Sequence, residues 1–337
     1  MNHDGTSSEP ASKRFRPENA RLTDDWAHSA RLLCCRVDPS GRFVFAGGTD
    51  NTIQRWEIGS GKQTAMTGHE NWVRTLCVSP DGRTLHSGAY HGRWLTWDVA
   101  AEVPTPVRSI QAHQGWLRGI AVSHDGQRIA TCGNDKFVRI WSAADGQLIR
   151  ELPGHPSVVY CLQFVPGSYD VVSGDIVGNI IHWRADDGSQ VRQFDLHEIV
   201  SHVGDLAPFG GVINLSFGPD GQRLTASGLH KVSNAPAGDR RAVAVSFNWA
   251  TAEKLPRQEC LKKEVNATMW RSLYHPGGTM IGIVEKCIGF WNSGAEDVFH
   301  FVETPSDIFD CDLHPDGVSL FMAHFDGHVR CLSCAAE

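Results

Sequence analysis

The stretch GHENWVRTLCVSPDGRTLHSGAYHGRWLTWDV, residues 68–99, carries the pattern that decides the fold. It contains three short apolar runs: one before Pro80, one that starts near Leu85, and one that ends at Trp97. Runs of this length that are rich in Val, Leu, Thr and Trp are typical of β-strands. The Pro-Asp-Gly turn reverses the chain tightly, because Pro fixes φ and Gly tolerates positive φ. The stretch therefore predicts a unit of short antiparallel strands, and it leaves the role of His69 open.

The Pro-Asp-Gly turn recurs along the chain in seven versions. The second residues of these turns are Pro39, Pro80, His124, Pro166, Pro219, Pro276 and Pro315. They stand 41, 44, 42, 53, 57 and 39 residues apart, and a period of about 40 to 45 residues is typical of four-stranded propeller blades. In the first four units a Trp follows the turn residue by 17 positions, at Trp56, Trp97, Trp141 and Trp183. Such fixed spacing predicts one repeated structural unit.

The units resemble the WD-repeat (Trp-Asp repeat) β-propeller family, with Gly-His at one end and Trp-Asp at the other. The resemblance covers about residues 27–334 and is strongest in the first four units. In the later units Phe247, Trp291 and Leu332 occupy the Trp position. It implies an all-β fold: a seven-bladed propeller of four-stranded antiparallel blades. The repeat units are predicted at approximately 27–62, 63–104, 105–150, 151–194, 195–255, 256–297 and 298–337.

Closure of the ring depends on the two ends of the chain. An open propeller leaves an unpaired strand edge. Too few residues follow Cys334 to form the last strand, so the family resemblance implies that an N-terminal strand at residues 21–26 supplies it. We expect residues 20–337 to form the propeller and residues 1–19 to be a disordered tail. The basic cluster at 13–16 is too short to predict a targeting signal.

Composition excludes several classes of protein. The hydrophobic content of 41% excludes a largely disordered chain, and the net charge of -7 argues against a general nucleic-acid-binding surface. No segment has the pattern of a signal peptide or a membrane span, so we expect a cytoplasmic protein that contacts no membrane. The ten cysteines are then expected to be reduced. Cys331 and Cys334 form a C-x-x-C without a second ligand pair, so we predict no metal site and no cofactor.

The histidines could belong to a catalytic Ser-His-Asp arrangement or to the framework of the blades. In the third unit the resemblance implies a hydrogen-bonded tetrad of His113, Thr131, Asp135 and Trp141. The incomplete versions are His28, Asp50 and Trp56 with Ala46 in the hydroxyl position; His69, Ser87 and Trp97 with His91 in the carboxylate position; and His155, Ser173 and Trp183 with Val177 in that position. A catalytic triad occurs once, in a cleft with an oxyanion hole. Because this pattern recurs with members replaced, we predict a structural role and no catalytic residue.

The resemblance also implies that one face of the propeller binds partners. The residues it places on that face are Arg31, Trp72, Arg74, Tyr90, Trp116, Arg118, Tyr160, Trp270 and Phe309, together with Thr49, Asn134, Val158, Ile176 and Phe325. Aromatic residues and Arg dominate binding hot spots, and Arg pairs well with carboxylate or phosphate. The alternative is that each Trp packs beneath a neighbouring loop.

Two insertions distinguish the fifth unit, within HEIVSHVGDLAPFGG and LHKVSNAPAGDRRA. The second carries Lys231, Arg240 and Arg241, which make a basic loop on an acidic protein. Repeat-specific insertions often mark a binding face, so we expect both insertions to project from it. The alternative is a pair of solvated loops without a partner.

Three functions remain open at this point. The favoured one is a non-catalytic scaffold for protein–protein interaction, a monomeric propeller that binds a protein or peptide within a larger complex. The first alternative is a propeller hydrolase with a metal or substrate in the central channel. The inner strands offer Leu33, Thr75, Gly119, Cys161, Leu215, Ser272 and Asp310, a set that we expect to be too apolar for a metal site. The second alternative, a chromatin or nucleic-acid-associated reader, is disfavoured by the negative charge.

Overall fold

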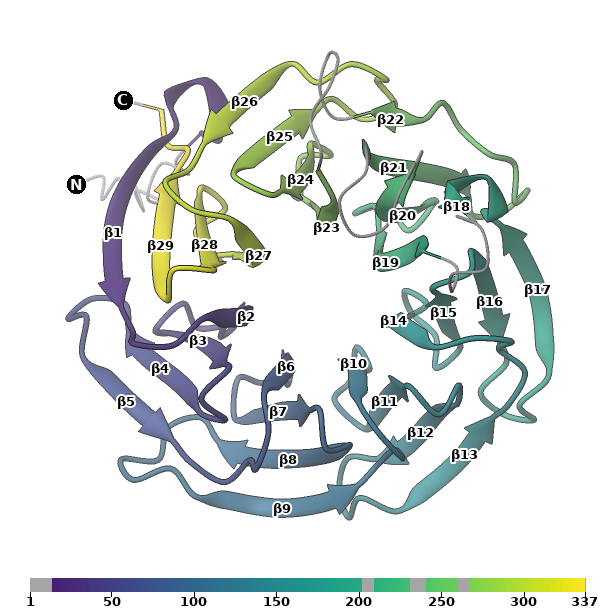
Figure 1. Cartoon of the computed structure of the whole chain (residues 1–337), viewed down its shortest axis with the longest axis horizontal. Helices are drawn as coiled ribbons and strands as arrows, with labels where there is room; N and C mark the ends of the chain where they lie inside the picture. The colour runs from purple at the N-terminus through teal and green to yellow at the C-terminus, as the bar shows by residue number, and fades with distance from the viewer. Residues whose placement is uncertain (1–13, 202–208, 231–240, 260–266, 337) are drawn as a thin grey trace, which may run out of the picture.

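The computed structural model of the chain describes residues 14–201, 209–230, 241–259 and 267–336. Seven antiparallel sheets are arranged in a ring around a central channel (Figure 1). Six sheets have four strands and one has five. The predicted all-β, seven-bladed propeller is therefore confirmed.

Each blade is a meander whose first long strand lines the channel and whose last strand lies at the rim (Figure 1). Blades one to three comprise β2 (Leu32–Val37), β3 (Phe43–Gly48), β4 (Ile53–Glu57) and β5 (Gln63–Met66); β6 (Val73–Val78), β7 (Thr84–Ala89), β8 (Arg93–Asp98) and β9 (Pro106–Gln111); and β10 (Leu117–Val122), β11 (Arg128–Gly133), β12 (Val138–Ser142) and β13 (Leu148–Leu152). Blades four and five comprise β14 (Val159–Phe164), β15 (Val171–Asp175), β16 (Asn179–Trp183) and β17 (Gln190–Asp195); and β18 (Val200–Ser201), β19 (Phe209–Phe217), β20 (Arg223–His230), β21 (Arg241–Asn248) and β22 (Gln258–Glu259). Blades six and seven comprise β23 (Met269–Tyr274), β24 (Met280–Val284), β25 (Cys287–Trp291) and β26 (His300–Glu303); and β27 (Ile308–Leu313), β28 (Ser319–His324), β29 (His328–Ser333) and β1 (Arg21–Ala27).

The third strand of every blade places a large apolar side chain at the same register position. The pairs across the second and third strands are Val44–Trp56, Leu85–Trp97, Ile129–Trp141, Val171–Trp183, Leu224–Phe247, Met280–Trp291 and Leu320–Leu332. Phe247 and Leu332 are buried as the tryptophans are, which confirms their predicted place in the repeat. Burial of this position in every blade provides much of the apolar core.

The N-terminal strand closes the ring as predicted. β1 pairs antiparallel with β29 and becomes the rim strand of blade seven. The ring of Trp26 stacks on Trp56 of blade one and on Phe321 of blade seven, with centroid distances of 6.5 and 5.8 Å. Asp25 accepts from the Arg330 guanidinium at 3.1 Å. A single strand therefore holds the first and last blades together.

The segment before this strand is more ordered than the sequence predicted. The Arg16 N–H donates to the Cys334 carbonyl at 2.6 Å, and the Phe15 ring stacks on His275 with centroids 4.2 Å apart. A short 3-10 helix, η1 (Pro17–Asn19), then leads into β1. Residues 14–19, which were predicted to be part of a disordered tail, therefore contact blades six and seven in the structure; residues 1–13 lie outside the described chain.

The cysteine pair near the C-terminus is packed in the last blade. Cys331 and Cys334 are both buried and free. Burial raises the pKa of the Cys331 thiol to about 11 and that of Cys334 to about 12, so both thiols are protonated near neutral pH. Within the described ranges, the structure also contains no helix long and apolar enough to cross a membrane.

The insertions of blade five lie largely outside the described residues. Their flanks are placed: Ser201 pairs with Phe209 across the first insertion, and His230 pairs with Arg241 across the second. Gly211 of β19 pairs with Leu229 of β20, so both insertions leave from the same end of the sheet. The positions of Lys231 and Arg240, and the expected projection of the two loops, stay predictions.

Candidate functional site

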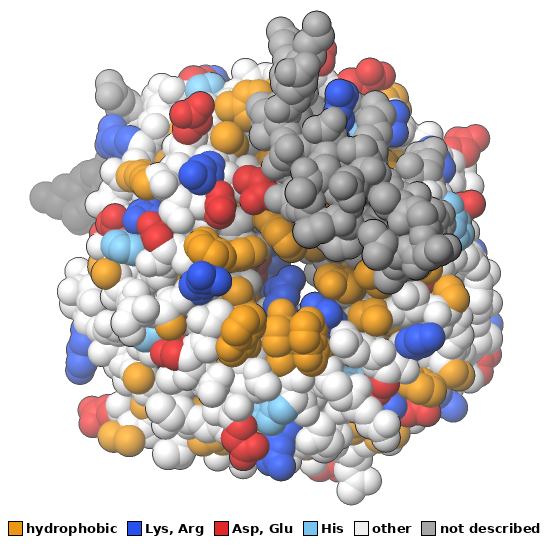
Figure 2. Space-filling view, viewed as in Figure 1, with side chains coloured by type: hydrophobic (Ala, Val, Ile, Leu, Met, Phe, Trp, Pro, Cys, Tyr) orange, Lys and Arg blue, Asp and Glu red, His pale blue; other side chains and the backbone are white. Residues whose placement is uncertain are grey.

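Every inner strand of the propeller carries a β-bulge near its start. The bulged residues are Leu33, Arg74, Arg118, Tyr160, Ile213, Trp270 and Phe309. A bulge adds one residue to a strand and re-aims its side chain. All of these residues except Leu33 line a cavity at the mouth of the central channel. Figure 2 shows arginine and apolar side chains gathered around this opening. Five of the seven were predicted as partner-binding residues, and Leu33 and Ile213 were not.

Aromatic rings from blades two to four form one continuous cluster, which we call the tryptophan cluster: Trp72, Tyr90, Trp116, Arg118 and Tyr160. The Tyr90 ring lies between Trp72 and Trp116, with centroid distances of 5.7 and 4.0 Å. The Arg118 guanidinium lies over the rings of Trp116 and Tyr160 at 4.2 and 4.3 Å. Trp72 and Trp116 remain 43% and 39% exposed. The cluster is therefore a preformed surface, since rings and guanidinium hold one another in place.

A second group lies across the channel, and we call it the phenylalanine cluster: Arg31, Trp270, Phe309 and Phe325. The Trp270 and Phe309 rings meet edge to face at 5.4 Å, and Phe309 contacts Phe325 at 5.7 Å. The Arg31 guanidinium lies 4.0 Å over the Phe325 ring, which is 36% exposed. The structure thus brings together residues of blades one, six and seven that the sequence placed on one face.

The loops that carry these residues are tied to the inner strands by backbone hydrogen bonds. Asn134 N–H donates to the Trp116 carbonyl at 2.9 Å, and Tyr90 N–H donates to the Trp72 carbonyl at 3.1 Å. The corresponding bonds in blades one and four join Thr49 to Arg31 and Ile176 to Val158, at 2.9 and 3.1 Å. In each of these four blades, the loop before the inner strand therefore contacts the loop after the second strand. The Trp and Tyr side chains on these loops are held on a rigid frame.

The inner strands, which were predicted to be too apolar for a metal site, also carry charged side chains that line the channel. Asp310 pairs with Arg36 at 2.7 Å and with Arg271 at 3.1 Å. Burial raises the pKa of Asp310, but the charges of Arg271 and Arg36 lower it by more, so the pKa of Asp310 lies below its usual range. Burial raises the pKa of Asp312 above its usual range despite the same two arginines.

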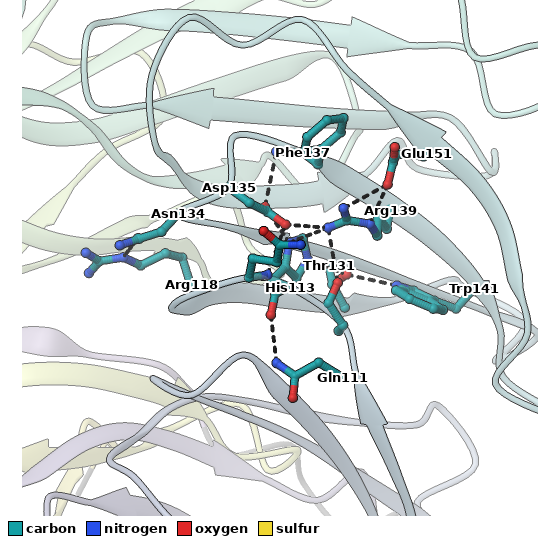
Figure 3. A network of polar contacts seen from close by, with 12 residues as sticks. Gln111, His113, Arg118, Thr131, Asn134, Asp135, Phe137, Arg139, Trp141 and Glu151 are labelled. Atoms are coloured by element: carbon teal, nitrogen blue, oxygen red, sulfur yellow. Dashed lines mark hydrogen bonds and ion pairs between the residues drawn. The ribbon is translucent and has the colours of Figure 1, made fainter.

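The histidine of blade three belongs to a complete hydrogen-bonded network (Figure 3). The Trp141 indole N–H donates to the Thr131 hydroxyl at 2.8 Å, and His113 Nε2 lies 2.8 Å from the same oxygen. His113 Nδ1 lies 2.8 Å from Asp135, which also accepts from Arg139 at 2.7 Å. Since an indole can only donate, the hydroxyl proton is free for Nε2, and Nδ1–H donates to the carboxylate. Burial raises the pKa of Asp135, but His113 and Arg139 lower it well below its usual range.

Blades two and four carry related networks. Each Trp indole donates to a serine that also contacts a histidine Nε2: Trp97, Ser87 and His69 in blade two, and Trp183, Ser173 and His155 in blade four. The expectation that Val177 stands in the carboxylate position of blade four is corrected. Asp175, two residues earlier, lies 3.0 Å from His155 Nδ1. The buried end of β15 supplies the acid there, and the fixed spacing did not reveal it.

The remaining two substitutions in the histidine networks have different consequences. In blade one, where Ala46 replaces the hydroxyl, His28 turns Nε2 toward Asp50 at 2.8 Å. In blade two, His69 Nδ1 is buried without a partner, and the His91 ring meets it edge-on at 5.5 Å. Burial lowers the pKa of His69 to about 3, and His91 adds to this shift. His69 is therefore neutral in the folded protein.

The blade-three network reaches the tryptophan cluster through one residue. Asn134 precedes Asp135 in the turn, and its side-chain oxygen accepts from Arg118 Nε at 2.8 Å (Figure 3). His113 and Arg139 fix the turn through Asp135, so they also fix the place of the Arg118 guanidinium. Framework and candidate binding surface are thus physically connected.

This combination of fold and blade networks agrees with the sequence comparisons: the chain is a β-propeller that contains four WD repeats. The family model for the WD domain, G-beta repeat, matches residues 21–57, 61–98, 104–142 and 146–183. Blades five to seven therefore share the fold without matching that model.

Curated relatives support the same class at low identity. The chain is 25% identical to an uncharacterized WD repeat-containing protein of Schizosaccharomyces pombe over 51% of this chain and 46% of the relative. It is 22% identical to Protein groucho of Drosophila melanogaster and to Transducin-like enhancer protein 2 of Mus musculus. These two matches cover 56% of this chain and 26% and 25% of the relatives. The chain thus spans less than half the length of the curated relatives it matches.

Proposed function

We propose that the chain is a non-catalytic platform that binds a protein or peptide partner across the mouth of its channel. The observation that carries this proposal is the pair of preformed aromatic and arginine clusters on one face. Trp72 and Trp116 are 43% and 39% exposed, although large aromatic rings are normally buried. Aromatic residues and Arg are the types that dominate the energy of protein interfaces.

The class of the chain supports the same function. WD-repeat propellers generally bind protein partners. The bulges and the ring stacking hold the surface in one arrangement before any partner arrives, which lowers the entropic cost of binding. A monomeric propeller acting within a larger complex fits this arrangement. The alternative that each Trp packs beneath a loop is disfavoured by the exposure of Trp72 and Trp116.

A framework role is the better proposal for the histidines than catalysis. The side chains of His113 and His155 are 0% exposed, so a substrate has no path to them. A hydrolase metal site in the channel is also disfavoured. Asp310 already pairs with two guanidinium groups, and the described residues contain no group of three or more His, Cys, Asp or Glu side chains placed to hold a metal ion. Metal analysis of the purified chain tests this alternative.

Affinity capture tests the platform proposal. The full chain and a triple variant, Trp72→Ala, Trp116→Ala and Arg118→Ala, are used as bait in a lysate of the organism that encodes the chain. We expect the variant to lose the partners that the wild type retains, because the tryptophan cluster is removed.

The matched control replaces three exposed apolar residues on rim strands of blades two and three: Val107, Leu148 and Ile149. This second triple alanine variant should keep every partner. Retention of all partners by the cluster variant would refute the platform proposal. Loss from both variants would show that surface apolarity in general, and not this face, carries the binding.

A further inference from the structure

Two hydrogen-bond donors at the mouth of the channel, Arg74 and Trp270, have no acceptor among the described residues. Arg74 and Arg118 occupy bulge positions of neighbouring blades, and no acidic residue occupies the other bulge positions. The Trp270 indole N–H lines the same cavity, and it is buried with no acceptor from any residue that the structure describes. A buried donor without an acceptor is costly, so such a group points to a missing partner.

Arg74 differs from the arginines that lie deeper in the channel. Arg36 and Arg271 are both paired with Asp310. Across the described part of the chain, the Arg74 guanidinium makes no hydrogen bond or ion pair, although the residue is only partly exposed. An arginine held in a recess without an acid is unusual, since charged groups that leave water are normally paired.

Arg118 adds a second positive charge beside it. Its Nε donates to Asn134, and its flat faces are covered by Trp116 and Tyr160, but no acid in the described chain pairs with it. Burial lowers the pKa of Arg118, and the charge of Arg74 lowers it further. The two guanidinium groups therefore repel each other, and an anion placed between them would relieve that repulsion.

We infer that the partner inserts an acidic side chain, the carboxylate of an Asp or Glu, between Arg74 and Arg118. An apolar or aromatic residue next to it then rests on Trp72, Tyr90 and Trp116. This inference rests on the proposed function, because it specifies the chemistry that the platform recognises. Charge complementarity selects the occupant: the mouth offers two guanidinium groups that no acid of the described residues pairs with, and Arg binds carboxylate in bidentate geometry.

Size and charge favour a carboxylate over a phosphate. The cavity at the mouth has a volume of about 70 Å³, far below the range of several hundred Å³ typical of sites for cofactors and other small molecules. Asp310 also lines this cavity, where Arg36 and Arg271 already pair with it, so a dianion would meet a buried carboxylate. A short side chain with a single negative charge fits the small volume and is repelled less by the buried carboxylate than a dianion is.

Peptide selection tests the inference even while the partner is unidentified. A phage-displayed library of random peptides is selected on the immobilised full chain, on Arg74→Gln, and on the control Arg93→Gln, an exposed arginine of β8. We expect wild type and Arg93→Gln to enrich peptides with Asp or Glu beside an apolar or aromatic residue. Arg74→Gln should not enrich the acid.

Binding of synthetic peptides then measures the effect. For an enriched peptide, replacement of its acid by the matching amide should weaken binding to wild type by about tenfold or more, and should hardly change binding to Arg74→Gln. A phosphoserine in place of the acid should bind less tightly than the acid does.

The outcomes separate this inference from the proposed function. If selected peptides lack an acid but lose binding when Trp72 and Trp116 are replaced, the carboxylate inference is wrong and the platform stands. Tighter binding of the phosphoserine peptide would overturn the choice of a carboxylate. If no peptide binds in a manner that depends on this face, the platform proposal itself fails.

Discussion

Removal of the His113 side chain should cost more stability than removal of His69, although both histidines occupy the same place in their blades. His113→Ala breaks two hydrogen bonds, at 2.8 Å to Thr131 and at 2.8 Å to the Asp135 carboxylate. His69→Ala breaks one, at 2.7 Å to Ser87, and it also removes a buried nitrogen that has no partner.

The expected difference follows from these bonds. A neutral hydrogen bond contributes about 1 kcal/mol net and one to a charged group about 2 kcal/mol. Asp135 keeps its ion pair with Arg139 at 2.7 Å, so no bare carboxylate is left behind. We therefore expect a loss of about 3 kcal/mol for His113→Ala and about 1 kcal/mol for His69→Ala. Loss of the ring volume is common to both variants and largely cancels in the comparison.

Urea unfolding followed by far-UV circular dichroism measures this difference. Tryptophan fluorescence is less suitable, because Trp141 and Trp97 belong to the networks that are changed. The free energy of unfolding should fall most for His113→Ala. Equal losses in the two variants, or a larger loss for His69→Ala, would refute the account of the networks.

Three further predictions concern closure, pH and thiol chemistry. Trp26→Ala should lower the free energy of unfolding by about 2 kcal/mol, because its half-buried ring contacts blades one and seven; an unchanged melting temperature would contradict closure by β1. Stability should fall as the pH drops from 6.5 toward 3, by up to about 1.4 kcal/mol per pH unit for each buried neutral histidine. Burial lowers the pKa of His86 to about 3, so the unfolded chain binds a proton there that the folded chain does not, and stability is lost toward acid pH. His86→Gln should flatten this dependence in urea unfolding curves recorded across the range, and an unchanged slope would count against it. Iodoacetamide at pH 8 should label Cys331 and Cys334 only after unfolding, because both thiols are buried and about one in a thousand Cys331 thiols is ionised at that pH. Labelling of either cysteine in the native protein, detected by peptide mass mapping, would contradict this prediction.

The fold was largely predictable because the signals that specify it are local and repeated. The interval from turn to Trp is set by the length of two strands and one turn, so it survives when the residue itself changes. Leu332 was found by this interval, and Phe247, which follows Pro219 by 28 residues, was found by aligning its segment with the other units. The register places both where a Trp stands elsewhere. The missing last strand could be predicted in the same way, since an open edge must be paired.

The parts that could not be predicted depend on contacts across blades or on irregular backbone. A bulge leaves no clear mark in composition, so the shared geometry of Leu33 and Ile213 with Arg74 was missed. Asp175 replaces the acid from a different backbone position, which only the buried geometry reveals. The ion pairs of the channel could not be predicted, because Arg36 and Arg271 reach Asp310 from the two neighbouring blades.

The central claim is that partners bind at the mouth of the channel, and site-specific crosslinking tests it most directly. A photoreactive benzoylphenylalanine is placed at Trp72 on the tryptophan cluster or at Val107 on the rim strand β9, two exposed positions on different surfaces. After illumination in lysate, we predict a crosslinked partner from position 72 and none of that mass from position 107. The same adduct from both positions, or an adduct from position 107 alone, would contradict the account.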